Sequence, residues 1–244
     1  MDRIRAIILT TQRTGSTFLV DCLGSHPQIH CASEILAGAA DEPIDKGPGR
    51  FRKLARWRDF VTSGALRPGH RMGRFYAGGA TKVRVFKVMY NHLANPFALR
   101  WLQQNEDVRI LHLRRYNLLK LYISKLLMPM RSRVQVFAPV AAVRTRVDPA
   151  RAIASMRKTV QLYDRFDQLF ERHRRLPLCY EDLFDGQFLR TETAALVCEF
   201  LEVERLPMKS RIVKLNPESI RDMIVNYDEL AAVISRTEFA DMLG

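Results

Sequence analysis

The chain has 244 residues, enough for one sizeable α/β domain or two small ones, and its content of 47% hydrophobic and 27% charged residues argues against wholesale disorder. Its net charge of +13 predicts a surface that attracts anions such as nucleotides, nucleic acid, acidic glycans or an anionic membrane. No apolar run reaches the roughly 20 residues of a membrane span, and Arg3 and Arg5 interrupt any leader-like segment. Four scattered cysteines without a C-x-x-C pair indicate free thiols, so we expect a cytoplasmic protein.

The start of the chain predicts an anion-binding loop. Residues 3–10 have the near-continuous Ile and Leu content of a buried parallel strand, and residues 16–23 carry apolar side chains at helical spacing. A strand that leads through a tight loop into a helix presents unpaired N–H groups at the positive end of the helix dipole. Arg13 would add a fixed cation. The loop lacks the Lys before Ser/Thr of nucleoside triphosphatases, and no acidic strand end for Mg²⁺ is evident, so we do not expect ATP or GTP hydrolysis.

The rest of the chain alternates strands and helices, which predicts an α/β sheet with its ligands at the carboxyl ends of the strands. Residues 38–79, rich in Gly, Pro and Arg, are expected to be a loop-rich insertion with one helix near 51–63, and residues 131–146 a basic irregular segment. Strands are expected at 28–32, 83–88, 108–113 and 176–180, and helices at 97–104, 117–128, from 149 onward, 192–201, 217–230 and in the tail.

A second basic junction follows the strand at 108–113. Arg114 and Arg115 end this strand, and Ser124 lies one to two turns into the next helix. A cation at a strand end and a hydroxyl on the helix can hold a second phosphate. An exposed Arg pair and an ordinary helical serine are the alternative interpretation.

The two junctions together resemble one enzyme family. Residues 12–19 look like the 5′-phosphosulfate loop of sulfotransferases that use 3′-phosphoadenosine 5′-phosphosulfate (PAPS), in the Arg form of carbohydrate, tyrosylprotein and bacterial members. Residues 112–119 with Ser124 resemble the family's 3′-phosphate motif. The interval from Arg115 to Ser124 is a residue longer than usual, so the choice between Arg114 and Arg115 stays open, with Arg115 preferred. Weaker similarities cover residues 23–34, 86–90 and 178–183.

The resemblance implies a three-layer, P-loop-like parallel sheet flanked by helices, in a single domain over residues 1–244 with insertions at about 38–79 and 130–148. It implies transfer of a sulfuryl group from PAPS to an acceptor hydroxyl by in-line displacement, without a metal, with a carbohydrate or glycolipid as the first choice of acceptor. The implied cofactor-binding residues are Gln12, Arg13, Thr14, Gly15, Ser16, Thr17, Arg115, Ser124, Tyr180 and Lys209, and the implied catalytic residues are Glu34, Lys87 and Arg13.

For three of these residues, the sequence context alone also suggests a role and an alternative to it. Glu34 follows an extended segment on the side of the first loop, and is a candidate base because a hydroxyl has a pKa far above 7; an exposed glutamate without a role is the alternative. Lys87 lies among apolar residues, where a lysine either points into a site or sits at a sheet edge. Lys209 belongs to a late basic stripe that either walls the nucleotide or is solvated.

Two other functions remain open from the sequence. The net charge of +13 also suits a basic nucleic-acid-binding α/β protein, although no nucleic-acid motif is recognisable and aromatic residues do not interleave with the basic stretches. A nucleotide-dependent phosphotransferase is the third hypothesis. The six histidines are not spaced like metal ligands, and His112, in an apolar strand, is expected to face the core.

Overall fold

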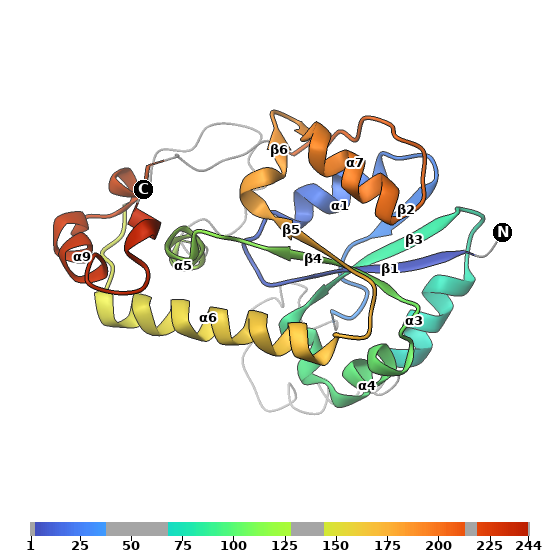
Figure 1. The fold of residues 1–244 in the computed structure, drawn as a ribbon, viewed down its shortest axis with the longest axis horizontal. Helices are drawn as coiled ribbons and strands as arrows, with labels where there is room; N and C mark the ends of the chain where they lie inside the picture. Colours follow the sequence, from blue (N-terminus) through green and yellow to red (C-terminus); the bar gives the residue numbers. More distant parts are fainter. Residues whose placement is uncertain (1–2, 38–67, 128–143, 213–218, 244) are drawn as a thin grey trace, which may run out of the picture.

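The computed structural model describes residues 3–37, 68–127, 144–212 and 219–243, and its centre is a five-stranded parallel sheet (Figure 1). The strand order is β2-β3-β1-β4-β5. The strands are β1 (Ile4–Thr10), β2 (Ile29–Ala32), β3 (Val83–Met89), β4 (Arg109–Arg114) and β5 (Arg175–Cys179). The first strand of the sequence is thus the middle strand of the sheet, and the predicted strands are confirmed to within two residues at each end.

Helices cover both faces of this sheet, which makes three layers. On one face lie α1 (Ser16–Gly24) and α7 (Thr191–Phe200), and on the other α3 (Pro68–Ala77), α4 (Pro96–Gln104) and α6 (Pro149–Leu169) (Figure 1). A hydrophobic core lies on each face of the sheet, and alternate residues of β1 pack into one or the other. Ala6 and Ile8 pack towards α1, and Ile7 and Leu9 towards α3 and α4. A strand buried on both faces explains the unbroken apolar run in the sequence.

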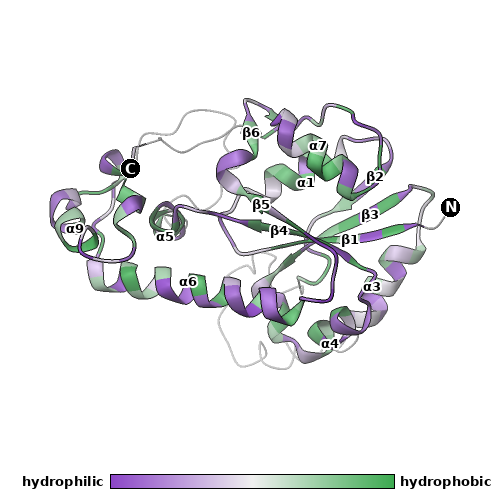
Figure 2. Ribbon diagram, viewed as in Figure 1, coloured by the Kyte–Doolittle hydropathy of each residue, from purple (hydrophilic) through white to green (hydrophobic). Residues whose placement is uncertain are grey.

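The remaining described elements lie outside the five-stranded sheet, and β6 and β7 form a two-stranded sheet of their own. They are α5 (Leu118–Leu126), α8 (Ile220–Met223), α9 (Tyr227–Ile234), a hairpin of β6 (Phe184–Asp185) and β7 (Phe188–Leu189), and the 3₁₀ turns η2 (Tyr90–Ala94), η3 (Tyr180–Asp182) and η4 (Ala240–Leu243). Hydrophobic and hydrophilic residues recur along the whole of α6 (Figure 2), and its buried residues are three or four positions apart, as in an amphipathic surface helix.

The helix boundaries follow from capping. The Asn95 side chain accepts from the N–H groups of Phe97 and Ala98 before α4, and Asp148 does the same for α6, in each case with proline at the first helical position. Asn117 caps α5 by accepting from Lys120. All three helices begin within one residue of the start that the sequence predicts.

Two elements differ from the sequence prediction. Residues 68–77, expected to lie in a loop-rich insertion, form α3, because Met72 and Tyr76, four apart, are buried against the sheet despite the local Pro and Gly. The single helix expected at 217–230 is broken between α8 and α9, where Ile224 is extended and Thr145 donates to and accepts from the backbone of residues 223 and 225. The helix expected near 51–63 and residues 131–143 lie outside the described residues.

Within the described ranges, no helix is both long and apolar enough to cross a bilayer. All four cysteines are free, as expected.

Candidate active site

The loop after β1 is held in an uncommon backbone conformation that suits anion binding. Arg13 and Gly15 both have positive φ, 67° and 74°. Gly15 is the N-cap of α1 and supplies no side chain, so the first N–H groups of the helix are left for another acceptor. Thr14 and Ser16, the residues on either side of Gly15, are both buried.

Hydrogen bonds fix this loop to the end of β4. The Thr10 hydroxyl donates to the Leu113 carbonyl at 2.8 Å and lies 2.6 Å from the Thr14 hydroxyl, which in turn donates to the carbonyl of Thr11. Because β1 and β4 are neighbours, the first loop and the second basic junction share one edge of the sheet.

The two junctions touch directly. The Arg13 Nε donates to the Ser124 hydroxyl on α5 at 2.9 Å, and the Arg115 guanidinium donates to the Arg13 carbonyl at 3.3 Å. Residues that are 102 and 111 positions apart in sequence therefore meet at one point. This contact brings together the two phosphate motifs expected from the sequence.

Arg115 is a buried cation with incomplete compensation. Its guanidinium lies over the Tyr180 ring, 4.3 Å from the centroid, and its Nε is 3.8 Å from a Glu181 oxygen and makes no hydrogen bond to the described residues. Burial lowers the pKa of this guanidinium. A bound anion would offset that desolvation cost.

Arg114 points away from the loop, towards α6. It forms an ion pair with Asp167, lies 3.0 Å from the His112 Nδ1, and stacks over the Tyr163 ring. The Tyr163 hydroxyl accepts from the Arg115 backbone N–H at 3.2 Å, so α6 also fixes the strand end between the two arginines. Of the two candidates, Arg115 is therefore the one that faces the first loop.

His112 belongs to the buried support of this strand end. Its Nε2 lies 2.6 Å from the Tyr90 hydroxyl and its Nδ1 3.3 Å from Asp167. Burial, together with Arg114, lowers the pKa of His112 to about 3, so the ring is neutral. Burial would raise the pKa of Asp167, but the hydrogen bond from Arg114 holds it below the usual value. The expected inward orientation of His112 is confirmed.

Tyr180 packs against the glycine of the loop. A Cβ on Gly15 would lie 2.8 Å from the Tyr180 Cδ2, closer than side chains allow. The next residue, Glu181, holds the turn that leads into α5: its carboxylate accepts from the N–H groups of Tyr116 at 2.9 Å and Asn117 at 3.1 Å. Burial would raise the pKa of Glu181, but these hydrogen bonds and one from the Cys179 thiol lower it.

Glu34 and Lys87 form an ion pair beside the first loop. The Lys87 Nζ is 2.8 Å from the Glu34 Oε1, and the lysine side chain is only 5% exposed, against 29% for the glutamate. The Lys87 backbone N–H donates to the Ser33 carbonyl, which holds the segment after β2 against β3. The His92 Nε2 is 3.4 Å from the Glu34 Oε2. Lys87 thus points into a site rather than lying at a sheet edge.

A cavity of about 560 Å³ joins this pair to the loop. Its lining residues are Gln12, Arg13, Ser16, Thr17, Ser33, Glu34, Ala37, Lys87, Met89 and Asn91. Six of the predicted site residues therefore line one space, and Thr14, Gly15, Arg115, Ser124 and Tyr180 adjoin it through the contacts above. Whether they bind a nucleotide stays a prediction.

Lys209 is not brought to this cavity. Its N–H donates to the Ser25 hydroxyl just beyond the far end of α1, and its ammonium lies over the exposed Phe188 ring. The sequence reading, for its part, gave no role to His92 or Asn91. The available signal was their position directly after a strand that carries a buried lysine.

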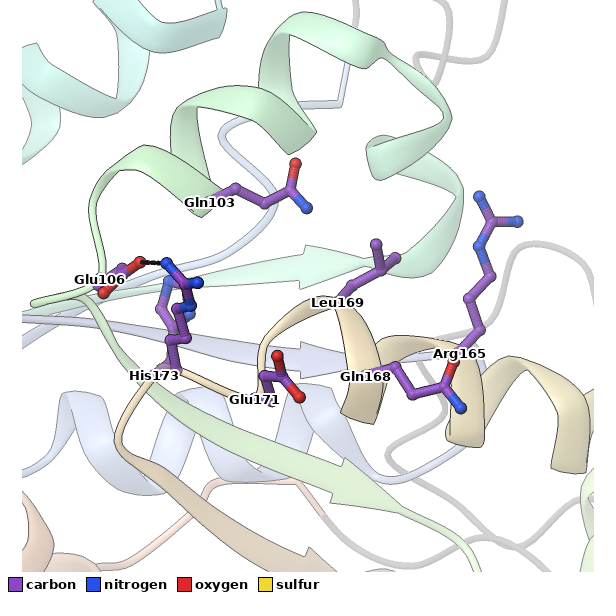
Figure 3. A pocket seen from close by; sticks show the side chains of 8 residues that line it. Gln103, Glu106, Arg165, Gln168, Leu169, Glu171 and His173 are labelled. Atoms are coloured by element: carbon purple, nitrogen blue, oxygen red, sulfur yellow. Dashed lines mark ion pairs between the residues drawn. The ribbon is translucent and has the colours of Figure 1, made fainter.

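A second pocket, of about 380 Å³, lies between the ends of α4 and α6 (Figure 3). Its walls mix charges: Glu106 and Glu171 face it together with Arg165 and Arg172, and the only ion pair drawn there joins Glu106 to Arg172 at 3.5 Å. Because α4 and α6 lead into the starts of β4 and β5, this pocket is at the amino edge of the sheet, opposite the loop. Among the described residues, no group of three or more His, Cys, Asp or Glu is placed to hold a metal ion.

Comparisons with known proteins identify the fold. No family model matches the sequence, and no curated protein matches it either. Among solved structures, the chain is similar to a sulfotransferase from Alicyclobacillus acidocaldarius, with a TM-score of 0.52 and 17% sequence identity over 99% of this chain and 93% of that one. The likeness shows the fold. The expected α/β class, with a parallel sheet between helices, is confirmed.

Proposed function

We propose that the chain is a sulfotransferase that moves a sulfuryl group from PAPS to an acceptor hydroxyl. The observation that carries the proposal is the direct contact of two basic strand-to-helix junctions, Arg13 with Ser124 and Arg115 with the Arg13 carbonyl, beside a cavity that holds the Glu34–Lys87 pair. The shared fold with a bacterial sulfotransferase supports it.

The two junctions suit the two ends of a nucleotide bisphosphate. Arg13 and the free N–H groups of α1 would hold the 5′-phosphosulfate, and Arg115 with Ser124 the 3′-phosphate, because guanidinium groups match phosphate oxygens in geometry and charge. The Tyr180 ring, which already stacks on Arg115, would complete this end. The ligand would then replace the Arg13–Ser124 hydrogen bond with its own oxygens.

The chemistry follows from where negative charge develops. In an in-line transfer, the acceptor oxygen forms a bond to sulfur while the bond from sulfur to the bridging oxygen breaks. Glu34 takes the acceptor proton, and Lys87 and Arg13 stabilise the charge on the leaving 3′,5′-adenosine bisphosphate. We propose a polar or anionic hydroxyl acceptor such as a carbohydrate or glycolipid, consistent with the net charge of +13.

Binding of 3′,5′-adenosine bisphosphate tests the cofactor assignment. At 100 times its Kd the ligand should stabilise the fold by about 2.7 kcal/mol, which is about 5–11 °C in Tm for a chain of this size. Arg13→Ala and Ser124→Ala should each reduce that shift. Arg172→Ala is the matched control, because this exposed arginine lies at the opposite edge of the sheet and should leave the shift unchanged.

Turnover tests the reaction. With ³⁵S-labelled PAPS and a panel of carbohydrate, glycolipid, tyrosyl-peptide and small-alcohol acceptors, the protein should label one class without added metal. Glu34→Gln should abolish labelling and keep the thermal shift. No thermal shift with the bisphosphate would refute the proposal; salt-sensitive binding of nucleic acid without nucleotide competition, or Mg²⁺-dependent ATP turnover, would favour the two alternatives instead.

A further inference from the structure

We propose that His92 is a positioning residue that holds the Glu34 carboxylate by its second oxygen. The inference rests on the proposed function and deepens it. The observation is that the two carboxylate oxygens face different donors: Oε1 lies 2.8 Å from the Lys87 ammonium, and Oε2 lies 3.4 Å from the His92 Nε2. Both donors come from one continuous piece of chain, β3 and the turn η2 that follows it.

The orientation of His92 is set by its own backbone. Its Nδ1 accepts from the Met89 N–H at 3.2 Å, at the end of β3. A ring nitrogen that accepts a hydrogen bond cannot carry a proton, so the neutral imidazole is protonated on Nε2, the atom that faces Glu34. The ring is 7% exposed, and packing therefore limits its alternatives.

The Glu34 side chain needs such support because backbone hydrogen bonds hold the main chain of its segment but not the carboxylate. It follows β2 in a turn and its side chain is 29% exposed. The backbone hydrogen bonds nearby, to the Ser33 carbonyl from Ile35 and Lys87 and to the Glu34 carbonyl from Ala37, fix the main chain and leave the side chain to its own contacts. A partly exposed glutamate that lacks side-chain contacts samples several rotamers, whereas a general base must be held within hydrogen-bond reach of one proton.

Lys87 and His92 have different roles once PAPS is bound. Lys87 is assigned to the charge that develops on the leaving oxygen, and as it turns to that oxygen it gives up Oε1. That oxygen becomes free to take the acceptor proton, and His92 keeps the carboxylate in place through Oε2. Without His92, Glu34 would lose its orientation at the step where it acts as a base.

Two variants separate the contact to Glu34 from the contact to Met89. In His92→Asn the side-chain oxygen can still accept from the Met89 N–H, but the amide is too short to reach Glu34. In His92→Gln the amide nitrogen takes the place of Nε2 and donates to Glu34. We expect His92→Asn to lower kcat about 10- to 100-fold, since a misplacement of about 1 Å can cost that much. His92→Gln should recover most of the loss, and neither variant should change KM for PAPS or the thermal shift with 3′,5′-adenosine bisphosphate.

The tautomer provides a second readout that needs no acceptor. Imidazole ¹H–¹⁵N correlation spectra of the wild type, assigned by the peak that His92→Asn removes, should show the Nε2–H form. Glu34→Gln should shift the His92 nitrogens. An Nδ1–H tautomer, or wild-type kcat in His92→Asn, would overturn the inference while the proposed function stands. Absence of transfer by the wild type to every acceptor class would refute the proposed function, and the inference with it.

Discussion

Gly15→Ala probes the packing of the loop after β1 against Tyr180. The new Cβ would lie 2.8 Å from the Tyr180 Cδ2, 3.0 Å from its Cε2 and 3.1 Å from the Phe184 Cζ, and the residue keeps a φ of 74°. The substitution therefore adds two separable costs, left-handed backbone strain and steric overlap with a ring. Because Tyr180 stacks on Arg115, displacement of the ring also disturbs the second basic junction.

The magnitude is the sum of these two costs. A non-glycine residue in the left-handed region costs about 1–2 kcal/mol. Overlap with packed side chains costs about 1–3 kcal/mol. The expected loss in free energy of unfolding is therefore about 2–5 kcal/mol, or roughly 4–20 °C in Tm for a chain of this length.

Gly186→Ala is the matched control. Gly186 also has a positive φ, 59°, but its Cβ would meet nothing within 4 Å. Thermal unfolding of both variants separates strain from overlap, and Gly15→Ala should cost less stability in a Tyr180→Ala background than in the wild type, by the part of the overlap that is due to Tyr180. Equal destabilisation by the two glycine substitutions, or an equal cost of Gly15→Ala with and without the Tyr180 ring, would show that Tyr180 does not press on the loop as described.

Other variants test the supports of the second junction. Arg115→Ala should remove most of the thermal shift with 3′,5′-adenosine bisphosphate, whereas Arg114→Ala should mainly lower the ligand-free Tm, because Arg114 pairs with Asp167 and faces away from the loop. His112 has its pKa lowered from 6.5 to about 3, so between these two pH values the unfolded chain binds more protons than the folded one. The free energy of unfolding should therefore decrease as the pH is lowered from 6.5 towards 3, by up to about 1.4 kcal/mol per pH unit, and His112→Gln should flatten that slope in a Tm-against-pH series. Glu181 has its pKa lowered from 4.5, so the stability from its hydrogen bonds to the turn before α5 is fully present above pH 4.5 and is lost as the pH falls through the lowered pKa. Glu181→Gln should cost about 1 kcal/mol at pH 7, and its Tm should converge with that of the wild type at acid pH.

The sheet was predictable because its signals are local. Apolar runs such as residues 4–10 mark strands buried on both faces, and Asn95-Pro96 and Asp148-Pro149 mark helix starts by capping chemistry. The helix Pro68–Ala77 was missed because Pro, Gly and Arg dominate its composition. Only the burial of Met72 and Tyr76 against the sheet, a tertiary effect, makes it a helix.

The site was predictable as a set of residues more than as an arrangement. The order of strands determines that the ends of β1, β3 and β4 are neighbours, and so places Arg13, Lys87 and Arg115 at one edge. The partners of each charge are long-range and carry no local signal: Arg114 turns to Asp167 on α6, and His92 reaches Glu34 across two segments. The position of Lys209 at the far end of α1 could not be read from its place in a basic stripe.

The central place of β1 has a consequence for how the protein folds. This strand, which leads into the loop after β1, pairs with residues 83–89 on one side and 109–113 on the other, so both of its partners in the sheet are distant from it in sequence. Closing such long sequence separations is slow, and the loop cannot take its shape until both pairings have formed. In a refolding experiment, binding of 3′,5′-adenosine bisphosphate should therefore recover only in the last, global phase. The rate at which this binding recovers should then equal the rate at which the whole sheet forms.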